Sequence, residues 1–481
     1  MIGVRRRGHR RSLLSCYRDP RWMALAAGAC AHTLFTIKTV DQIQSGVGMK
    51  FSRFTALIFS AVVCFLISGC GDTFRPVATP LPQPSPDPQS FRLAVITACE
   101  LGGQGLTPCN PNGVTSQGSD VNVSGDSVEG VVPLGRSPVF ALVQNSGAVA
   151  TITTADFDND TVSQHSDNHI TANSAGIVSA PSTIGLSAGA RPISLANANG
   201  VLYVAEFGRN VVGVLAGFPT ALTTEIPVGV NPVNLALLPN SNKVYVVNRG
   251  SGSVTVISTS DNSVAATIPV GSSPVWAVAS ADSSRVFVVN QGSGSVSVID
   301  ATSDTVIATL TVGSSPNYAV FDARNQRVVV TNPGSNSVSV INADPTSPAF
   351  KNVTNVAVGV NPVSVTALAD GTRIYVANTG SNSVSVINSL SLAVSKTISL
   401  SSTITVADQT PSPVWIASDS QSLKVFTANR DSQNASVILT STDSELSDST
   451  GKPIRIPAPN ADPTCTGACV RLSPVFIAVG G

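Results

Sequence analysis

Few side chains in this sequence could act in catalysis or metal binding, and those that could lie between positions 156 and 169. Asp156, Asp158 and Asp160 alternate with other residues, as at the start of a calcium-binding loop, but the sixth loop position lacks the glycine that the sharp turn requires. His165 and His169 follow, and in an extended strand they would lie roughly 15 Å from the aspartates, too far to share one ion. We treat the aspartates as weak metal candidates and expect neither a metal ion nor a cofactor.

Groups for acid–base catalysis are sparse elsewhere. Of the four histidines in the chain, His9 and His32 lie before residue 70. Neither a nucleophile motif nor a buried-looking pair of acids stands out, so the sequence names no catalytic residue. It favours a non-catalytic protein over an enzyme.

The strands that would carry these side chains belong to a repeat of about forty residues. The run KVYVVN at 243–248 returns as RVFVVN at 285–290, and each copy continues through Gly and Ser into a second Val-rich run. Each unit holds four short β-branched runs separated by Gly, Asn, Ser and Asp, which is typical of four strands joined by tight turns. One such unit is a propeller blade.

A proline opens the first run of every unit and allows the blades to be counted. These prolines are Pro138, Pro192, Pro232, Pro274, Pro316, Pro362, Pro413 and Pro474. The last unit is cut short by the end of the chain, but 92–97 and 127–135 resemble its missing strands. We therefore predict an all-β fold, a single propeller over residues 91–481 with eight four-stranded blades, closed where N- and C-terminal strands share a blade.

The repeated runs resemble the YVTN-repeat β-propeller family. Val244-Tyr-Val-Val-Asn248 and Ile374-Tyr-Val-Ala-Asn378 are each followed by a Gly-Ser turn and a Val-Ile run, and the likeness covers about residues 120–440. Members of that family usually have seven blades, so seven is the alternative to the repeat count of eight. Seven-bladed lactonases are similar to the family in fold, which makes a lactonase-like hydrolase the alternative function.

The N-terminal region predicts where in the cell the protein is located. Residues 49–69 have the basic start, apolar middle and small-residue end of a signal peptide, and they lead into Leu-Ile-Ser-Gly-Cys70. This ending resembles a bacterial lipobox, in which Cys70 would carry the lipid. Translation is then expected to start at Met49, with 1–48 a mis-assigned extension. A Pro-rich linker occupies 70–90.

This reading places the protein in a bacterial cell envelope, attached to the membrane by its lipid alone. Gly71 after the cysteine favours the outer over the inner membrane by family analogy. Without residues 1–69, which hold ten basic and two acidic residues, the chain keeps 18 basic and 26 acidic residues, a net charge of −8. A nucleic-acid partner is not expected for a chain without a basic surface.

Four cysteines remain beyond Cys70. They are Cys99, Cys109, Cys465 and Cys469. In an oxidising compartment an even set is read as disulfides, with three alternative pairings. The pairs that are local in sequence close the shortest loops.

Positions that vary between blades are the best candidates for binding. Two residues after each proline the chain carries Phe140, Ser194, Asn234, Trp276, Tyr318, Ser364, Trp415 and Phe476. Aromatic rings and arginines are the usual anchors of interfaces, so we expect a binding face built from Trp276, Tyr318, Trp415, Arg249 and Arg430.

A second set of residues, eleven places after the proline, is cationic. It comprises Lys243, Arg285, Arg327, Arg373 and Lys424, and we interpret these charges as keeping the strands soluble rather than as an anion site. The predicted function is a monomeric, non-catalytic scaffold that binds an envelope protein or a cell-surface polymer.

Overall fold

The computed structural model describes residues 92–100, 107–108, 116–122, 127–134, 136–146, 149–168, 177–178, 182–216, 220–238, 240–400, 410–458 and 473–479. All of them belong to the second of two units, residues 87–481. The predicted extension, signal peptide, lipidated Cys70 and linker lie outside the described residues. Among those described, no helix has the length and apolarity needed to cross a bilayer.

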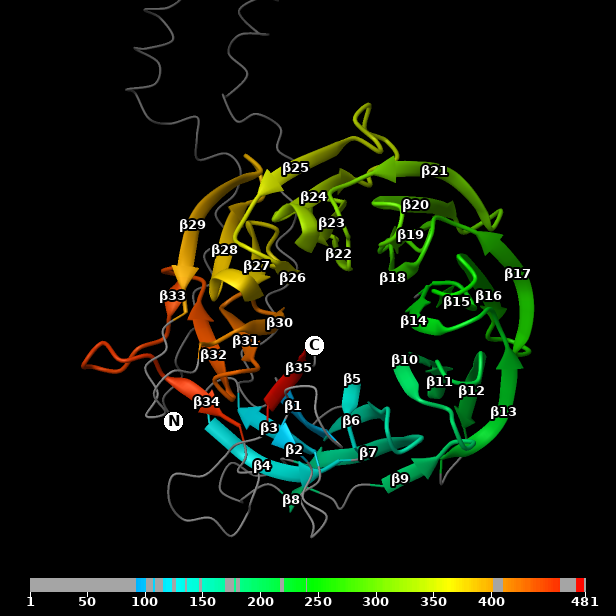
Figure 1. The fold of residues 1–481 in the computed structure, drawn as a ribbon, viewed down its shortest axis with the longest axis horizontal. Coiled ribbons are helices and arrows are strands. Elements are labelled where there is room, and N and C mark those ends of the chain that lie inside the picture. Colours follow the sequence, from blue (N-terminus) through cyan, green and yellow to red (C-terminus); the bar gives the residue numbers. More distant parts are fainter. Residues whose placement is uncertain are drawn as a thin grey trace, which may run out of the picture. The chain divides into compact units, whose positions relative to one another are not determined.

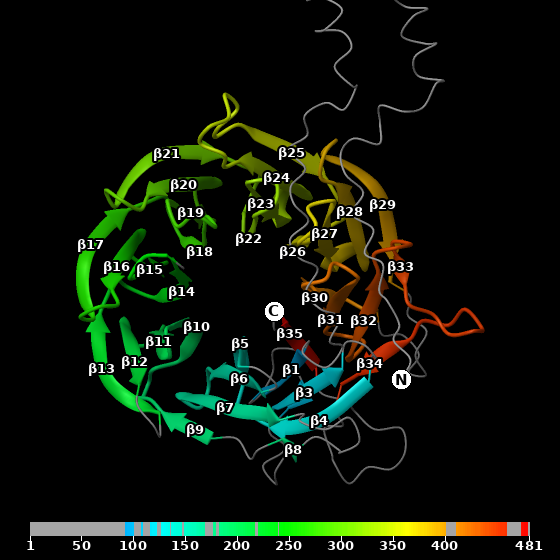
Figure 2. The same cartoon turned by 180° about the vertical axis from the view of Figure 1, so that it is seen from behind.

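The described strands form eight sheets arranged around a ring (Figures 1 and 2), one for each proline-led inner strand. Five sheets follow one another along the chain. The first consists of β5 (Pro138–Ser146), β6 (Val149–Asp156), β7 (Thr161–Asn168), β8 (Ile177–Val178) and β9 (Ser182–Gly185), and the second of β10 (Pro192–Ala198), β11 (Val201–Glu206), β12 (Val211–Ala216) and β13 (Ala221–Pro227). The next three are β14 (Pro232–Leu237), β15 (Lys243–Asn248), β16 (Ser253–Ser258) and β17 (Ser263–Pro269); β18 (Pro274–Ala279), β19 (Arg285–Asn290), β20 (Ser295–Asp300) and β21 (Thr305–Thr311); and β22 (Tyr318–Asp322), β23 (Arg327–Asn332), β24 (Ser337–Asn342) and β25 (Val353–Ala357).

Two further sheets complete the regular part of the ring. They are β26 (Pro362–Ala367), β27 (Arg373–Asn378), β28 (Ser383–Asn388) and β29 (Ala393–Ser399); and β30 (Pro413–Ser418), β31 (Lys424–Asn429), β32 (Asn434–Leu439), β33 (Ser444–Glu445) and β34 (Arg455–Pro457). Short 3-10 turns, η2 (Pro333–Ser335) and η3 (Thr379–Ser381), follow two of the second strands. The all-β propeller predicted from the repeats is confirmed.

The remaining sheet joins the two ends of the chain. β1 (Arg92–Glu100), β3 (Gln117–Asn122) and β4 (Ser127–Pro133) come from the N-terminal side, a short β2 (Thr107–Pro108) pairs with β1, and β35 (Ser473–Val479) supplies the inner strand. β35 runs antiparallel to β1, with Leu93 opposite Val479. The predicted closure between N- and C-terminal strands is confirmed, and it leaves the ring without an open end.

Burial explains why the middle strands read as nearly continuous apolar runs. Each sheet is covered by a neighbouring sheet on both faces, so the second strand of the blade is buried at five of its six positions, as in β15 and β19. The apolar clusters accordingly span two neighbouring blades; one of them joins Tyr245 and Val254 to Val286 and Ile299. The outermost strands alternate instead, as β21 does, because one side meets solvent.

The turn before most inner strands has the sequence Gly-x-x-Pro, as in Gly229 to Pro232. It lies against the turn after the second strand on one face of the ring, which we call the turn face. The backbone N–H of Arg249 donates to the carbonyl of Asn231 over 2.9 Å. A Cβ on Gly229 would lie 2.7 Å from Cγ of Asn248. The glycine therefore leaves room for the recurring asparagine.

The asparagine that ends the second strand of several blades has a structural role. Nδ2 of Asn248 donates to Oγ1 of Thr255 over 2.9 Å, and Nδ2 of Asn290 donates to Oγ of Ser297 over 2.9 Å. Both asparagines are fully buried. They tie the second strand of a blade to the third, where a polar side chain inside a sheet needs a partner.

Candidate binding site at the ring axis

Every described inner strand except β22 starts with the same local distortion. Pro274 lies opposite Asn290, but Trp276 lies opposite Val289, so the pairing shifts between these two positions. The same shift follows the first proline of β5, β10, β14, β26 and β30. This bulge sets the direction of the side chain two residues after the proline.

Five of these side chains form the central aromatic cluster, which comprises Phe140, Trp276, Tyr318, Trp415 and Phe476. Ring centroids are 4.7 Å apart for Trp276 and Tyr318, and 4.9 Å apart for Tyr318 and Trp415. Phe476 lies 4.1 Å from Trp415 and 5.3 Å from Phe140. Offset and edge-on contacts of this kind stabilise aromatic groups beyond simple burial.

The cluster fills the middle of the ring at this level. Trp276 lies 6.4 Å from Phe140 and 6.4 Å from Trp415, although β18 is separated by two complete blades from β5 on one side and from β30 on the other. Side chains from such distant blades can meet only across the axis. Phe476 is 7% exposed, and the other four rings are half-buried.

The three polar side chains at matching positions are buried and bind neighbouring inner strands instead. Oδ1 of Asn234 accepts from the N–H of Ala277 over 2.9 Å. Oγ of Ser194 accepts from the N–H of Leu235 over 3.2 Å, and Ser364 serves the next blade in the same way. The inner-strand positions thus divide into polar ties between blades and aromatic rings at the axis.

One donor in the cluster is unmet. Nε1 of Trp276 is buried and has no hydrogen-bond partner among the described residues, whereas a buried indole N–H normally finds one. Burial also raises the pKa of the Tyr318 hydroxyl, so this group is a neutral donor at physiological pH. The cluster therefore combines apolar rings with groups that can donate to an acceptor.

The two predicted arginines lie on the turn face and contact other residues. Arg249 is exposed and donates to Oε1 of Gln291 over 3.4 Å. Arg430 forms an ion pair with Asp431 over 2.9 Å in which both side chains are about two-fifths exposed. The structure thus brings Trp276, Tyr318 and Trp415 together and leaves Arg249 and Arg430 on the surrounding turns.

The three aspartates of the weak metal prediction each bind protein groups of their own. Asp156 is buried and accepts from the hydroxyls of Thr161 and Ser163. Asp158 accepts from Ser137, and Asp160 from the backbone N–H groups of Gly189 and Arg191 over 2.7 and 2.8 Å. Within the described part of the chain, no three His, Cys, Asp or Glu side chains are placed to hold a metal ion. His165 is buried in β7, and His169 lies outside the described residues.

Glu206 is a buried acid that the sequence prediction omits. It occupies the place of Asn248 in its blade, is 0% exposed, and both carboxylate oxygens lack a partner among the described residues. Burial, together with Glu225 and Asp160, raises the pKa of Glu206 to about 7, while Arg209 opposes this shift. Alignment of Ala205-Glu206-Phe207 with the asparagine repeats is the signal that could have identified it.

The prediction also overlooks a Gly-x-Ser-x-Gly sequence at 185–189. Here Oγ of Ser187 donates to Oε1 of Glu225 over 2.6 Å. The motif follows β9 and leads to another strand, β10, rather than to the helix of a nucleophile elbow. Glu225 is also paired with Arg209 over 3.0 Å, so this carboxylate is shared between the serine and a cation.

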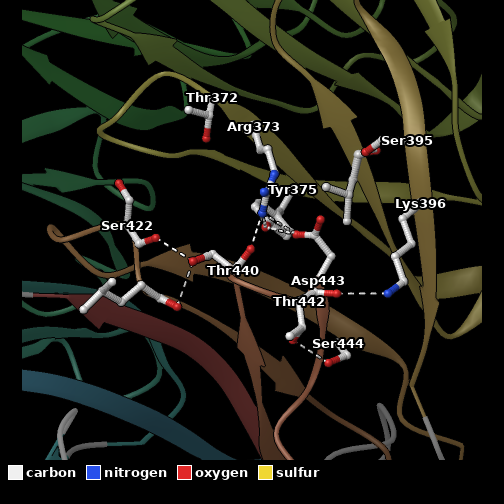
Figure 3. A network of polar contacts seen from close by, with 12 residues as sticks. Thr372, Arg373, Tyr375, Ser395, Lys396, Ser422, Thr440, Thr442, Asp443 and Ser444 are labelled. Atoms are coloured by element: carbon white, nitrogen blue, oxygen red, sulfur yellow. Dashed lines mark hydrogen bonds and ion pairs between the residues drawn. The ribbon is translucent and has the colours of Figure 1, made fainter.

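The recurring cations serve a purpose that the sequence does not reveal. Arg373 binds Asp443 over 2.8 Å and the carbonyl of Thr440, both in the next blade (Figure 3). Tyr375 donates to the same carboxylate. Lys243 repeats the arrangement with Asp304 over 2.8 Å. These residues link neighbouring blades, a role that the interpretation from the sequence did not include.

The cysteine prediction stays a prediction. Cys99 is in β1, but its side chain is outside the described part, as are Cys109, Cys465 and Cys469.

No protein-family model and no curated protein matches this sequence. Solved structures do match. AztD from Citrobacter koseri is 12% identical with a TM-score of 0.54, and the match covers 81% of this chain and 97% of AztD. The dihydro-heme d1 dehydrogenase NirN, solved in complex with DHE, is 12% identical with a TM-score of 0.56, covering 77% of this chain and 74% of NirN.

These neighbours differ in function, and at this identity the likeness shows the propeller fold alone. A function for this chain has to be argued from its own residues.

Proposed function

We propose that this protein is a non-catalytic binding scaffold of the YVTN-repeat kind, held at the bacterial cell envelope by a lipid on Cys70. Its partner is an envelope protein or a cell-surface polymer. The lipobox-like sequence and the Pro-rich linker support the attachment. The central aromatic cluster supports the binding role.

The observation that carries the proposal is the unmet indole N–H of Trp276 within half-buried aromatic rings. Aromatic side chains supply large apolar contact area at low cost in conformational entropy. A partner that lays an apolar group on the rings would use this contact area, and its acceptor would reach the buried Nε1 once the Trp276 side chain turns. The exposed guanidinium of Arg249 on the turn face could bind polar groups at the edge of such a contact.

The residues at the axis favour binding over catalysis. The eight inner-strand positions carry aromatic, serine and asparagine side chains, without a carboxylate or an imidazole. General acid–base catalysis requires such a group within hydrogen-bond reach of the substrate.

Crosslinking in the native envelope tests the proposal. The full lipidated protein is crosslinked in its own cells and purified, and its partners are identified by mass spectrometry. We expect the double variant Trp276→Ala/Trp415→Ala to recover about tenfold less of the wild-type partner. Trp276→Phe, which keeps a ring and removes the N–H, should give an intermediate loss. Leu390→Ala is the matched control, since Leu390 is 82% exposed in the turn after β28, away from the cluster. A folded double variant that retains every partner would show that the cluster is not the binding site.

A lactonase-like hydrolase is the competing function. Among the described residues, the Ser187–Glu225 hydrogen bond is the feature that could supply a nucleophile and a base for it. If the wild type recovers no macromolecule but hydrolyses simple lactones, and Ser187→Ala abolishes that turnover without loss of folding, the scaffold proposal fails. The proposed membrane attachment is tested separately. The Cys70→Ser variant should lack the mass of the acyl groups and should no longer be found in the membrane fraction.

A further inference from the structure

A groove of about 470 Å³ lies at the rim of the ring, between β29 and the blade that follows it. Its lining residues are Lys396, Thr397, Ile398, Ser399, Asp443, Ser444, Glu445, Ser447, Gly451, Lys452 and Pro453. This surface lies on outer strands, whereas the central aromatic cluster lies on inner strands of the sheets.

The groove follows the edge of a strand. Four consecutive residues of β29 line it, from Lys396 to Ser399. Successive side chains of a strand point to opposite faces, so a wall made of consecutive residues is the strand edge and its backbone. β29 is the last strand of its sheet, and among the described strands it pairs with β28 alone. An edge of this kind presents unpaired N–H and C=O groups.

The opposite wall exists because the outer strand of the next blade is interrupted. β33 and β34 pair with opposite ends of β32, and the hairpin between them projects from the ring (Figures 1 and 2). Arg455 binds Glu445 over 2.9 Å, with the two side chains 5% and 8% exposed. This buried ion pair holds the two halves of the interrupted strand together, so the hairpin forms an ordered wall of the groove.

The charges in the groove favour an acidic occupant. Its two carboxylates are already paired, Asp443 with Arg373 and Glu445 with Arg455. Nζ of Lys396 donates to a neutral group, the carbonyl of Thr442, over 3.0 Å (Figure 3). Lys396 has no carboxylate partner among the described residues, whereas Lys452 interacts electrostatically with Asp448 of the same hairpin. The unbalanced charge is positive.

We propose that the free edge of β29 binds an extended, acidic peptide segment of a partner protein as an additional strand. Backbone hydrogen bonds to the edge would supply affinity, and carboxylates that reach Lys396 and Lys452 would supply selectivity. Other blades lack this combination. The positions that match Lys396 in β13, β17, β21 and β25 are Thr224, Ala266, Ala308 and Thr354, all uncharged. The site is thus specific to one blade and separate from the proposed axis site.

A fluorescent peptide in which glutamate alternates with valine or threonine is the probe, and binding to the full-length protein is measured by anisotropy. We expect saturable binding. Lys396→Glu/Lys452→Glu should weaken it by about tenfold or more. A matched control is Lys351→Glu, a charge reversal on a lysine outside the groove, which should leave binding unchanged. Trp276→Ala/Trp415→Ala should also bind normally, which separates this site from the axis site.

The backbone contribution is tested with the same peptide methylated at alternate nitrogens, which keeps the side chains and blocks strand pairing. This peptide should lose binding. Three results would each overturn the proposal: no saturable binding by the wild type, equal binding of the methylated peptide, or unchanged binding by the folded lysine double variant.

Discussion

A side chain at position 213 would collide with Glu206: a Cβ on Gly213 would lie 2.4 Å from Oε1 of the glutamate. In the blades with an asparagine at the place of Glu206, the place of Gly213 holds a hydroxyl residue, such as Thr255 or Ser297, that accepts from the asparagine. Here the larger acid and the glycine occur together, and the acid has lost its hydroxyl partners.

The first prediction is a pH-dependent stability caused by Glu206. Its pKa is raised from 4.5 to about 7 in the folded protein, so between these values the folded state binds more protons than the unfolded state. Stability therefore falls as pH rises from about 4.5 to about 7, and the loss is complete above that range. The shift corresponds to about 3 kcal/mol at most. Glu206→Gln should remove most of this slope in urea unfolding, gaining stability at pH 8 and little at pH 4. Equal slopes in variant and wild type would contradict the assignment.

The second prediction concerns the glycine of the Gly-x-x-Pro turn. A Cβ on Gly271 would lie 2.6 Å from Cγ of Asn290 and 2.4 Å from Oγ of Ser293. Gly271→Ala should therefore destabilise the protein by about 1–3 kcal/mol, as overpacking does. Gly451→Ala is the comparison for steric collision, since no atom lies within 4 Å of the added Cβ there, and its cost should come only from its positive φ of 81°. Equal costs at the two positions would show that Asn290 does not limit the turn.

The third prediction concerns the link between the β26–β29 and β30–β34 blades. Asp443 binds both Arg373 and Tyr375 of the neighbouring blade. Asp443→Ala should lower the free energy of unfolding by about 2 kcal/mol, because several partners lose their acceptor together. Asp431→Ala, which breaks the exposed pair with Arg430, should cost less than about 1 kcal/mol. Thermal and urea unfolding of both variants measure the difference, and a larger cost for the exposed pair would refute the importance of the link.

The fourth prediction concerns ring closure. Truncation after Leu472 removes β35, which pairs with β1 and carries Phe476 into the central aromatic cluster. The edge of β1 that pairs with β35 would be exposed, and we expect loss of cooperative unfolding or aggregation. Truncation after Val479 removes two residues beyond the strand and should change the melting temperature little. Unchanged melting of the longer truncation would mean that closure does not stabilise the ring.

The repeats in the sequence are sufficient to predict the propeller, its strand order and its closure. Repeated β-branched runs, with a proline at the start of each inner strand, determine which segments pair, because these signals are local to one blade. Residues 92–97 could be assigned to the last blade for the same reason: they resemble RVFVVN at 285–290.

The contacts that side chains make between blades could not be predicted from the sequence, because they depend on how the blades pack. Trp276 and Phe140 meet because ring closure fixes the width of the central space, and no signal within one repeat specifies that width. Arg373 and Asp443, far apart in the sequence, become partners only when adjacent blades are stacked. The burial that raises the pKa of Glu206 likewise depends on how β12, β13 and the neighbouring turns pack around it. The repeat predicts which strands pair by hydrogen bonds, whereas the distances between sheets are set by the packing of the whole ring.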